Sequence, residues 1–253
     1  MDLGLRDRVY LVTGGTRGLG FATARALVDD GAKVVVSGRD EKRAAEAAEA
    51  LGGPEHALGI AADNGDGATA ERLVAAALAR FERLDGALVS VGGPPPGGIT
   101  SIEDDQWRDA FESVFLGAVR LARATAGALV AGGSIGFVLS SSVRQPIPGL
   151  GVSNGLRPGL AMVAKTLADE LGPRGIRVFG LLPGRIDTDR VRELDTASDD
   201  PERTRARQVA TVPLGRYGTP EEFGRVAAFT LSPAASYVTG VMLPVDGGLL
   251  RTL

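Results

Sequence analysis

The sequence predicts an α/β fold built on a single doubly wound parallel sheet of seven strands, with helices on both faces. Short runs of apolar residues alternate along the chain with longer segments of helical periodicity. The short runs are apolar on both faces, as expected for parallel strands that helices cover on two sides. A glycine-rich stretch at residues 13–20 follows the first run and opens the first helical segment. This order of strand, glycine turn and helix is the context that a phosphate-binding loop requires.

The composition limits the possible functions. The chain has 253 residues, no cysteine and one histidine, which excludes disulfides, thiolate nucleophiles and metal sites built from cysteines or several histidines. The net charge of −3 gives no reason to expect nucleic acid or a membrane as a partner. Residues 1–8 carry early charges and no apolar segment of a signal peptide. We therefore expect one cytoplasmic domain, residues 1–253, that binds a small molecule and no metal.

The elements can be placed in order along the chain. A long helix is expected over 102–130, and its start is assigned to a cap formed by Ser101 and Asp104. Residues 195–207 are charged and lack apolar periodicity, which predicts the most mobile segment. Thr219 and Glu222 form a predicted capping box. The expected strands are 9–12, 33–36, 57–61, 86–91, 134–139, 177–181 and 241–243.

The glycine loop carries the first functional signal. Gly14, Gly18 and Gly20 follow the pattern Gly-x-x-x-Gly-x-Gly. Glycines let the backbone approach a pyrophosphate, and the N-terminus of the following helix offers unpaired N–H groups. A plain glycine turn is the alternative. The spacing resembles that of the short-chain dehydrogenase/reductase family, and the resemblance runs along nearly the whole chain. It implies a Rossmann-like fold and a nicotinamide dinucleotide cofactor.

The end of the second strand bears on the choice of cofactor. Gly38 stands where the family's NAD-binding members usually carry Asp, and Arg39 follows it. Arg17 lies inside the glycine loop. Two guanidinium groups can bind a 2′-phosphate, so NADP(H) is expected over NAD(H). In the alternative, Arg39 is a solvated residue and Asp40 merely caps the next helix.

Further motifs match the family after later strands. Residues 89–93 correspond to its Asn-Asn-Ala-Gly segment, although both Asn are replaced, and residues 183–188 match its Pro-Gly-x-x-x-Thr. Asp63 resembles the residue that binds the adenine amino group, with helix capping by Asp63 or Asn64 as the alternative. A mobile substrate lid is implied at about 186–212. The resemblance implies cofactor contacts from Gly14, Thr16, Arg17, Gly18, Leu19, Gly20, Arg39, Asp63, Asn64, Ser90, Gly92, Arg157, Pro183, Gly184, Ile186 and Thr188.

The family's proton relay is largely missing. When residues 164–171 fix the register, the catalytic Tyr and Lys fall on Ser153 and Arg157, while the catalytic Ser is kept as Ser140. The family's Asn falls on Val114. A serine hydroxyl has no pKa near neutrality, and an arginine stays charged, so neither exchanges protons as Tyr and Lys do. Ordinary alcohol–ketone interconversion is therefore not expected, and the positional equivalents Ser140, Ser153 and Arg157 are the candidate catalytic residues.

Two classes of function remain. In the first, the protein is an NADP(H)-dependent oxidoreductase with an altered proton relay and an unknown substrate. Its substrate would be already activated, such as an iminium; Asp187 or Asp189 would supply a proton, or Arg157 and Arg144 would hold an anionic group. In the second, the protein binds NADP(H) without catalysis, as a sensor or as the structural partner of an active relative. The resemblance also implies a homodimer or homotetramer.

Overall fold

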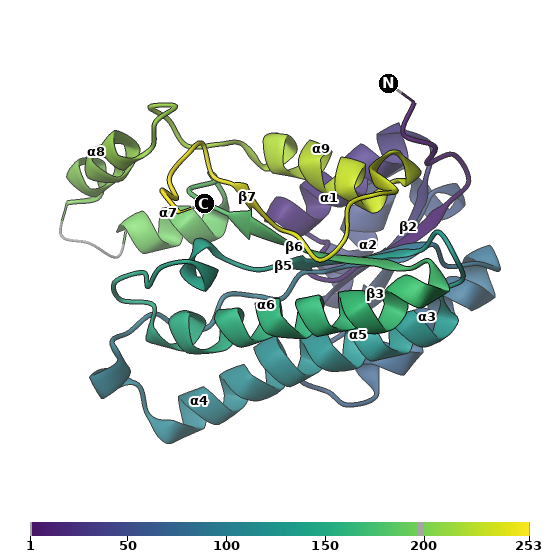
Figure 1. The fold of residues 1–253 in the computed structure, drawn as a ribbon, viewed down its shortest axis with the longest axis horizontal. Coiled ribbons are helices and arrows are strands. Elements are labelled where there is room, and N and C mark those ends of the chain that lie inside the picture. Colours follow the sequence, from purple (N-terminus) through teal and green to yellow (C-terminus); the bar gives the residue numbers. More distant parts are fainter. Residues whose placement is uncertain (1, 197–199, 253) are drawn as a thin grey trace.

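The sheet is parallel throughout and has seven strands in the order β3-β2-β1-β4-β5-β6-β7. The computed structural model describes residues 2–196 and 200–252. The chain winds outward from β1 in one direction and then returns to pair β4 with the other side of β1 (Figure 1). This arrangement confirms the predicted fold class. The strands are β1 (Val9–Val12), β2 (Lys33–Gly38), β3 (Ala57–Ala61), β4 (Gly86–Val89), β5 (Ser134–Val138), β6 (Arg177–Pro183) and β7 (Met242–Val245).

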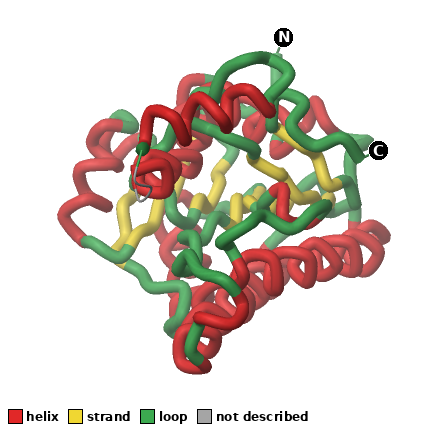
Figure 2. The backbone as a smooth tube through the Cα atoms, turned by 90° about the vertical axis from the view of Figure 1, so that its left-hand side faces the viewer, coloured by secondary structure: helices red, strands yellow, loops and turns green. Residues whose placement is uncertain are grey.

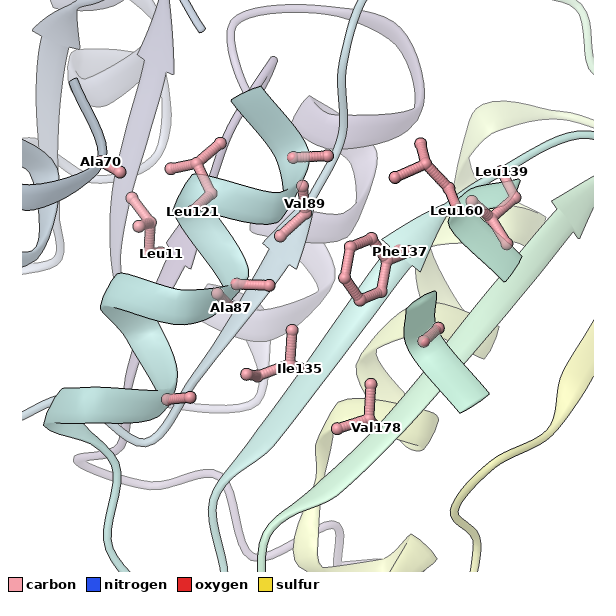
Figure 3. Close-up of a cluster of buried hydrophobic side chains, with 14 of the residues drawn as sticks. Leu11, Ala70, Ala87, Val89, Leu121, Ile135, Phe137, Leu139, Leu160 and Val178 are labelled. Carbon is pink, nitrogen blue, oxygen red and sulfur yellow. The ribbon is translucent and has the colours of Figure 1, made fainter. Parts of the chain in front are cut away.

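Helices cover both faces of the sheet, as Figure 2 shows. One apolar core joins the sheet to α3, α5 and α6, and a second joins it to α1, α2 and α9. Figure 3 shows strand residues Ile135 and Phe137 between Leu121 of α5 and Leu160 of α6. The helices are α1 (Gly18–Asp29), α2 (Glu41–Ala50), α3 (Thr69–Phe81), α4 (Asp104–Ala110), α5 (Gly117–Ala128), α6 (Gly151–Leu171), α7 (Asp189–Thr196), α8 (Pro201–Thr211) and α9 (Pro220–Leu231).

The long helix expected over 102–130 is not a uniform α-helix. A π-helical segment, Phe111–Leu116, separates α4 from α5, and Val114 is buried within it. The predicted cap at Ser101 and Asp104 is also wrong, because Glu103 and Gln106 form the capping box that starts α4. π-helical turns are frequent at functional sites. Here the turn coincides with the position assigned to the family's Asn.

The charged segment over 195–207 is more regular than expected. Its described residues lie mainly in α7 and α8, while residues 197–199 of the predicted lid lie outside the described residues. Helix α8 has no apolar stripe, and its start is stabilised by a cap instead. Asp200 accepts a hydrogen bond from the N–H of Arg203, and Pro201 occupies the first position of the helix. In the described part of the chain, no helix has the length and apolar character needed to cross a membrane.

Candidate functional site

The glycine loop is fastened to the end of β4. The Thr13 hydroxyl donates to the Ser90 carbonyl (2.9 Å) and accepts from the Ser90 N–H (3.0 Å). A Cβ atom at Gly20 would lie 2.3 Å from the carbonyl oxygen of Gly14, and one at Gly14 would lie 2.8 Å from that of Ser90. The turn therefore requires glycine at both positions, as the loop motif predicted. Thr13 was not among the predicted contacts, although it directly follows β1.

The end of β2 has no room for a side chain at Gly38. An added Cβ atom would lie 2.7 Å from Cγ2 and 2.8 Å from Oγ1 of Thr16. An Asp at this position would require Thr16 to move. Asp40 does cap α2, accepting from the Arg43 N–H at 2.8 Å, so that alternative is correct for Asp40. The Arg39 side chain is exposed, which agrees with either role that the sequence left open for it.

The lid comes back to the same loop. Thr188 lies against Gly18, with its Cγ2 atom 3.7 Å from where a Cβ would stand. The Nη1 atom of Arg17 lies 3.8 Å from Oδ2 of Asp189, the first residue of α7. The Pro-Gly-x-x-x-Thr segment is thus adjacent to the phosphate-binding loop. The 2′-phosphate role of Arg17 stays a prediction.

Several other predicted contacts have structural roles. The Asp63 carboxylate accepts from the Gly65 N–H (2.9 Å), but α3 starts only at Thr69, so neither Asp63 nor Asn64 caps it. The backbone carbonyl of Asn64 instead packs against Gly117, where an added Cβ would lie 2.2 Å from the carbonyl oxygen. Gly184 packs equally closely on Asp246, and Ile186 is buried. A Cβ at Gly92 would meet nothing within 4 Å, so this segment borders open space.

Helix α6 places Ser153 and Arg157 one turn apart on the same face. The hydroxyl closest to Ser153 is that of Ser142, with 3.3 Å between the two Oγ atoms. Ser140 instead accepts from the Ser142 N–H (3.1 Å) and caps a short 3₁₀ turn. Ser142 is therefore a site residue that the sequence analysis missed. The run of three serines after β5 was the available signal.

Arg157 brings a buried positive charge to the carboxyl ends of β4 and β5. Its Nη1 atom donates to the Val138 carbonyl at 2.7 Å, and Nη2 reaches the carbonyls of Val91 and Gly92 at 3.5 Å. The side chain makes no ion pair with a carboxylate of the described residues. Loss of hydration lowers the pKa of Arg157 to about 10. The guanidinium remains cationic at neutral pH.

The two acidic candidates for proton donation both lie near arginine side chains. Asp187 accepts from Nε of Arg192 (2.9 Å) and from Nη2 of Arg205 (3.3 Å). The bond to Arg192 is the main reason that the pKa of Asp187 lies below its ordinary value. Asp189 is exposed and lies near Arg17. The bonds to Arg192 and Arg205 favour the charged form of Asp187, and the expectation that Asp187 or Asp189 supplies a proton stays a prediction.

These contacts belong to a chain of alternating charges that runs from the glycine loop through the lid. The Tyr217 hydroxyl donates to the buried carboxylate of Asp195 at 3.0 Å. The pKa of Tyr217 is raised to about 12, mainly by burial and next by the hydrogen bond to Asp195. The predicted lid and the glycine loop are thus connected by ion pairs. The order of side chains is Arg17, Asp189, Arg192, Asp187, Arg205, Asp195 and Arg185, with separations of 3.8, 3.6, 2.9, 3.3, 4.0 and 3.7 Å.

The parallel sheet and the glycine turn before α1 define a dinucleotide-binding protein of the Rossmann type. A family model described as Enoyl-(Acyl carrier protein) reductase matches residues 14–250. The chain belongs to the short-chain dehydrogenase/reductase family, and it is an oxidoreductase by that membership.

Relatives match it over almost their whole length. An uncharacterised oxidoreductase of Methylorubrum extorquens is 34% identical, covering 97% of this chain and 98% of the relative. The 3-oxoacyl-[acyl-carrier-protein] reductase of Salmonella typhimurium is 32% identical, with 98% and 99% covered.

Solved structures agree over their full length. L-sorbose reductase from Gluconobacter frateurii, in complex with NADPH and L-sorbose, has a TM-score of 0.91 at 29% identity, and both chains are fully covered. A short-chain oxidoreductase from Pseudomonas aeruginosa PAO1, described as containing an atypical catalytic center, has a TM-score of 0.90 at 27% identity, again with full coverage of both.

Proposed function

We propose that the protein is an NADP(H)-dependent oxidoreductase that acts on a small molecule without the family's Tyr–Lys proton relay. The observation that carries the proposal is the end of β2, where Thr16 fills the space of an acidic side chain at position 38 and Arg39 is exposed. An acidic residue there would bind the ribose 2′-hydroxyl of NAD, whereas arginine suits the 2′-phosphate of NADP. The NADPH complex of L-sorbose reductase supports the same choice.

The residues present fit a dinucleotide. Gly14, Gly18 and Gly20 would face the pyrophosphate, with the N-terminus of α1 behind it, and Thr188 would lie beside them. When bound, NADPH supplies a hydride. The substrate carbon accepts it, and the substrate must then take a proton from water or carry a positive charge beforehand. An iminium meets the second condition, because hydride addition neutralises it.

The chain's own groups act on the substrate by position and charge. The hydroxyls of Ser140, Ser142 and Ser153 can donate to a substrate oxygen. Arg157 can stabilise negative charge that develops near the ends of β4 and β5. Neither group supplies a proton at a pKa near neutrality. The proposed enzyme therefore depends on electrostatic stabilisation rather than general acid catalysis.

Binding of the cofactor is the direct test. In a fluorescence titration of the purified protein, we expect NADPH to bind about tenfold or more tightly than NADH, since a charged hydrogen bond contributes about 1.5–3 kcal/mol. The Arg39→Ala variant should lose most of this preference while it keeps its affinity for NADH. Arg43→Ala, an exposed arginine one turn into α2, is the matched control. Equal affinities for NADPH and NADH would overturn the assignment of NADP(H).

We also propose that the protein is a homo-oligomer, a dimer or a tetramer, associating through the helices around α5 and α6. Phe111 and Met162 are exposed on these helices, at 45% and 66%. A contact between subunits would remove these two apolar side chains from water.

A further inference from the structure

Arg157 is a cation with no counter-ion among the residues that the structure describes. Its guanidinium is buried, and its hydrogen-bond partners are backbone carbonyls only: Val138 at 2.7 Å, and Val91 and Gly92 at 3.5 Å. A guanidinium has five N–H donors in a planar fork. One short bond uses little of this capacity. A buried charge that lacks an opposite charge destabilises the protein, and a ligand anion would offset that cost.

Two buried hydroxyls lie on or against the same face of α6 as Arg157. The Oγ atoms of Ser142 and Ser153 are 3.3 Å apart, and both side chains are buried. Ser153 precedes Arg157 by one helical turn, so the two side chains share a face of α6. Serine hydroxyls can rotate to donate to an anion. The cation and the hydroxyl pair together resemble a receptor for a negatively charged group.

A second guanidinium approaches the same segment from the lid. Nη2 of Arg190 donates to the Pro94 carbonyl at 2.8 Å, and its Nε atom would lie 3.1 Å from a Cβ at Gly93. Residues 91–94 are thus contacted by Arg157 and by Arg190. The acidic group near Arg190 is Glu193, at 3.9 Å and exposed. Positive charge therefore exceeds negative charge along this segment.

We infer that the site binds a substrate that carries a carboxylate, with the guanidinium of Arg157 and the hydroxyls of Ser142 and Ser153 as its receptor. This inference rests on the proposed function, because it assigns the substrate class of that same site. A carboxylate can accept two parallel, charge-assisted hydrogen bonds from the planar fork of arginine, which a neutral group cannot do with the same strength. It also gives the buried cation an anionic partner, which residues 2–196 and 200–252 do not provide.

The test uses two pairs of probes that differ in charge and hardly in shape: benzoate with benzamide, and 3-phenylpropionate with its amide. The protein is first saturated with NADPH, and binding of each probe is followed by calorimetry. At least one carboxylate should bind tenfold or more tightly than its amide. Arg157→Met should abolish this difference, because it removes the charge at similar length. Arg123→Met, on the exposed side of α5, should leave it unchanged.

Separate outcomes distinguish the two proposals. Failure of NADPH to bind concerns the proposed function, and the probes are then titrated against the protein alone. Carboxylates that bind no better than their amides would overturn the inference, as would an Arg157→Met variant that keeps the difference. If Arg157→Met loses affinity for NADPH but keeps the difference between carboxylate and amide, Arg157 serves the cofactor and the inference is overturned. If Arg157→Met does not fold, Ser142→Ala should weaken the carboxylate at least threefold and leave the amide unaffected; an unchanged carboxylate would contradict the inference.

Discussion

Ser153 and Arg157 determine what chemistry the site can perform. A general acid is most effective when its pKa lies near the working pH. Burial lowers the pKa of Arg157 only to about 10, and the hydroxyl of Ser153 meets another hydroxyl, that of Ser142, rather than a base. Both side chains can therefore orient and stabilise a substrate, but neither exchanges a proton readily at neutral pH.

Restoring the relay should change the reaction. We expect the double variant Ser153→Tyr, Arg157→Lys to gain NADPH-dependent reduction of neutral ketones by about a hundredfold or more, because a general acid contributes that much. Consumption of NADPH with a ketone panel measures it. Ser153→Phe, Arg157→Lys supplies the bulk without the hydroxyl and should gain nothing. No gain in a variant that still binds NADPH would favour a protein that binds the cofactor without catalysis.

The site could be predicted in part at this scale. Arg39, Ser153 and Arg157 could be selected from the sequence alone. The end of a strand and the pattern of a helix fix how these positions align with the family's motifs. Ser142 was missed, since its bond to Ser153 depends on how the 3₁₀ turn after β5 packs on α6. The pairing of Asp187 with Arg205 was also invisible, because it joins two lid segments whose folding the sequence does not indicate.

At the scale of elements, a buried arginine side chain donates hydrogen bonds to backbone carbonyls that have no partner within their helix. The last carbonyls of a helix lack partners within the helix. Arg177, at the start of β6, donates to the carbonyls of Thr230, Leu231 and Ser232 at 2.7, 3.0 and 2.9 Å. It also donates to Val238 at 3.3 Å. One side chain thus ties the end of α9 to the sheet.

Removing this side chain should destabilise the protein strongly. We expect Arg177→Met to lower the free energy of unfolding by about 3 kcal/mol or more, because several buried carbonyls lose their donor at once. Urea denaturation measures the difference. Arg225→Met, at an exposed position of α9, should change stability by less than about 0.5 kcal/mol. A similar small change for Arg177→Met would show that water replaces the guanidinium at little cost.

Strand positions were predicted well because each strand is an apolar run bounded by polar residues. The capping box of Thr219 and Glu222 was confirmed as well, with bonds of 3.3 and 2.8 Å. The π-helical segment Phe111–Leu116 carries no comparable signal, since its residues fit an α-helix equally well. Helices α7 and α8 could not be predicted for another reason: a cap and ion pairs support them, and they lack the apolar periodicity that indicates a helix.

At the scale of the molecule, the helices α4, α5 and α6 form one side of the fold (Figure 1). The rings of Phe111 and Phe115 stack with centroids 5.2 Å apart. A Cβ at Gly159 of α6 would lie 2.9 Å from the Phe115 ring, so this glycine lets the two helical segments come close. Phe111 and Met162 remain exposed. This side has the apolar character of a subunit contact.

Charged substitutions here should separate subunits. We expect light scattering to give a dimer or a tetramer for the wild type, and a monomer for the double variant Phe111→Glu, Met162→Glu, because an interface does not accommodate unpaired buried carboxylates. Leu214→Glu, which is 66% exposed near the lid, should leave the mass unchanged. A wild type that is monomeric at micromolar concentration would contradict the proposal.

The bonds between Thr13 and Ser90 have a consequence for biosynthesis. They join residues 77 positions apart. On that side β1 pairs with β4, which follows β2 and β3 in the chain. Ser90 emerges from the ribosome after the glycine loop, and until then the loop lacks this support. A dinucleotide that needs the formed loop would therefore bind only after β4 has been made and paired with β1, and its binding would then stabilise the folded protein.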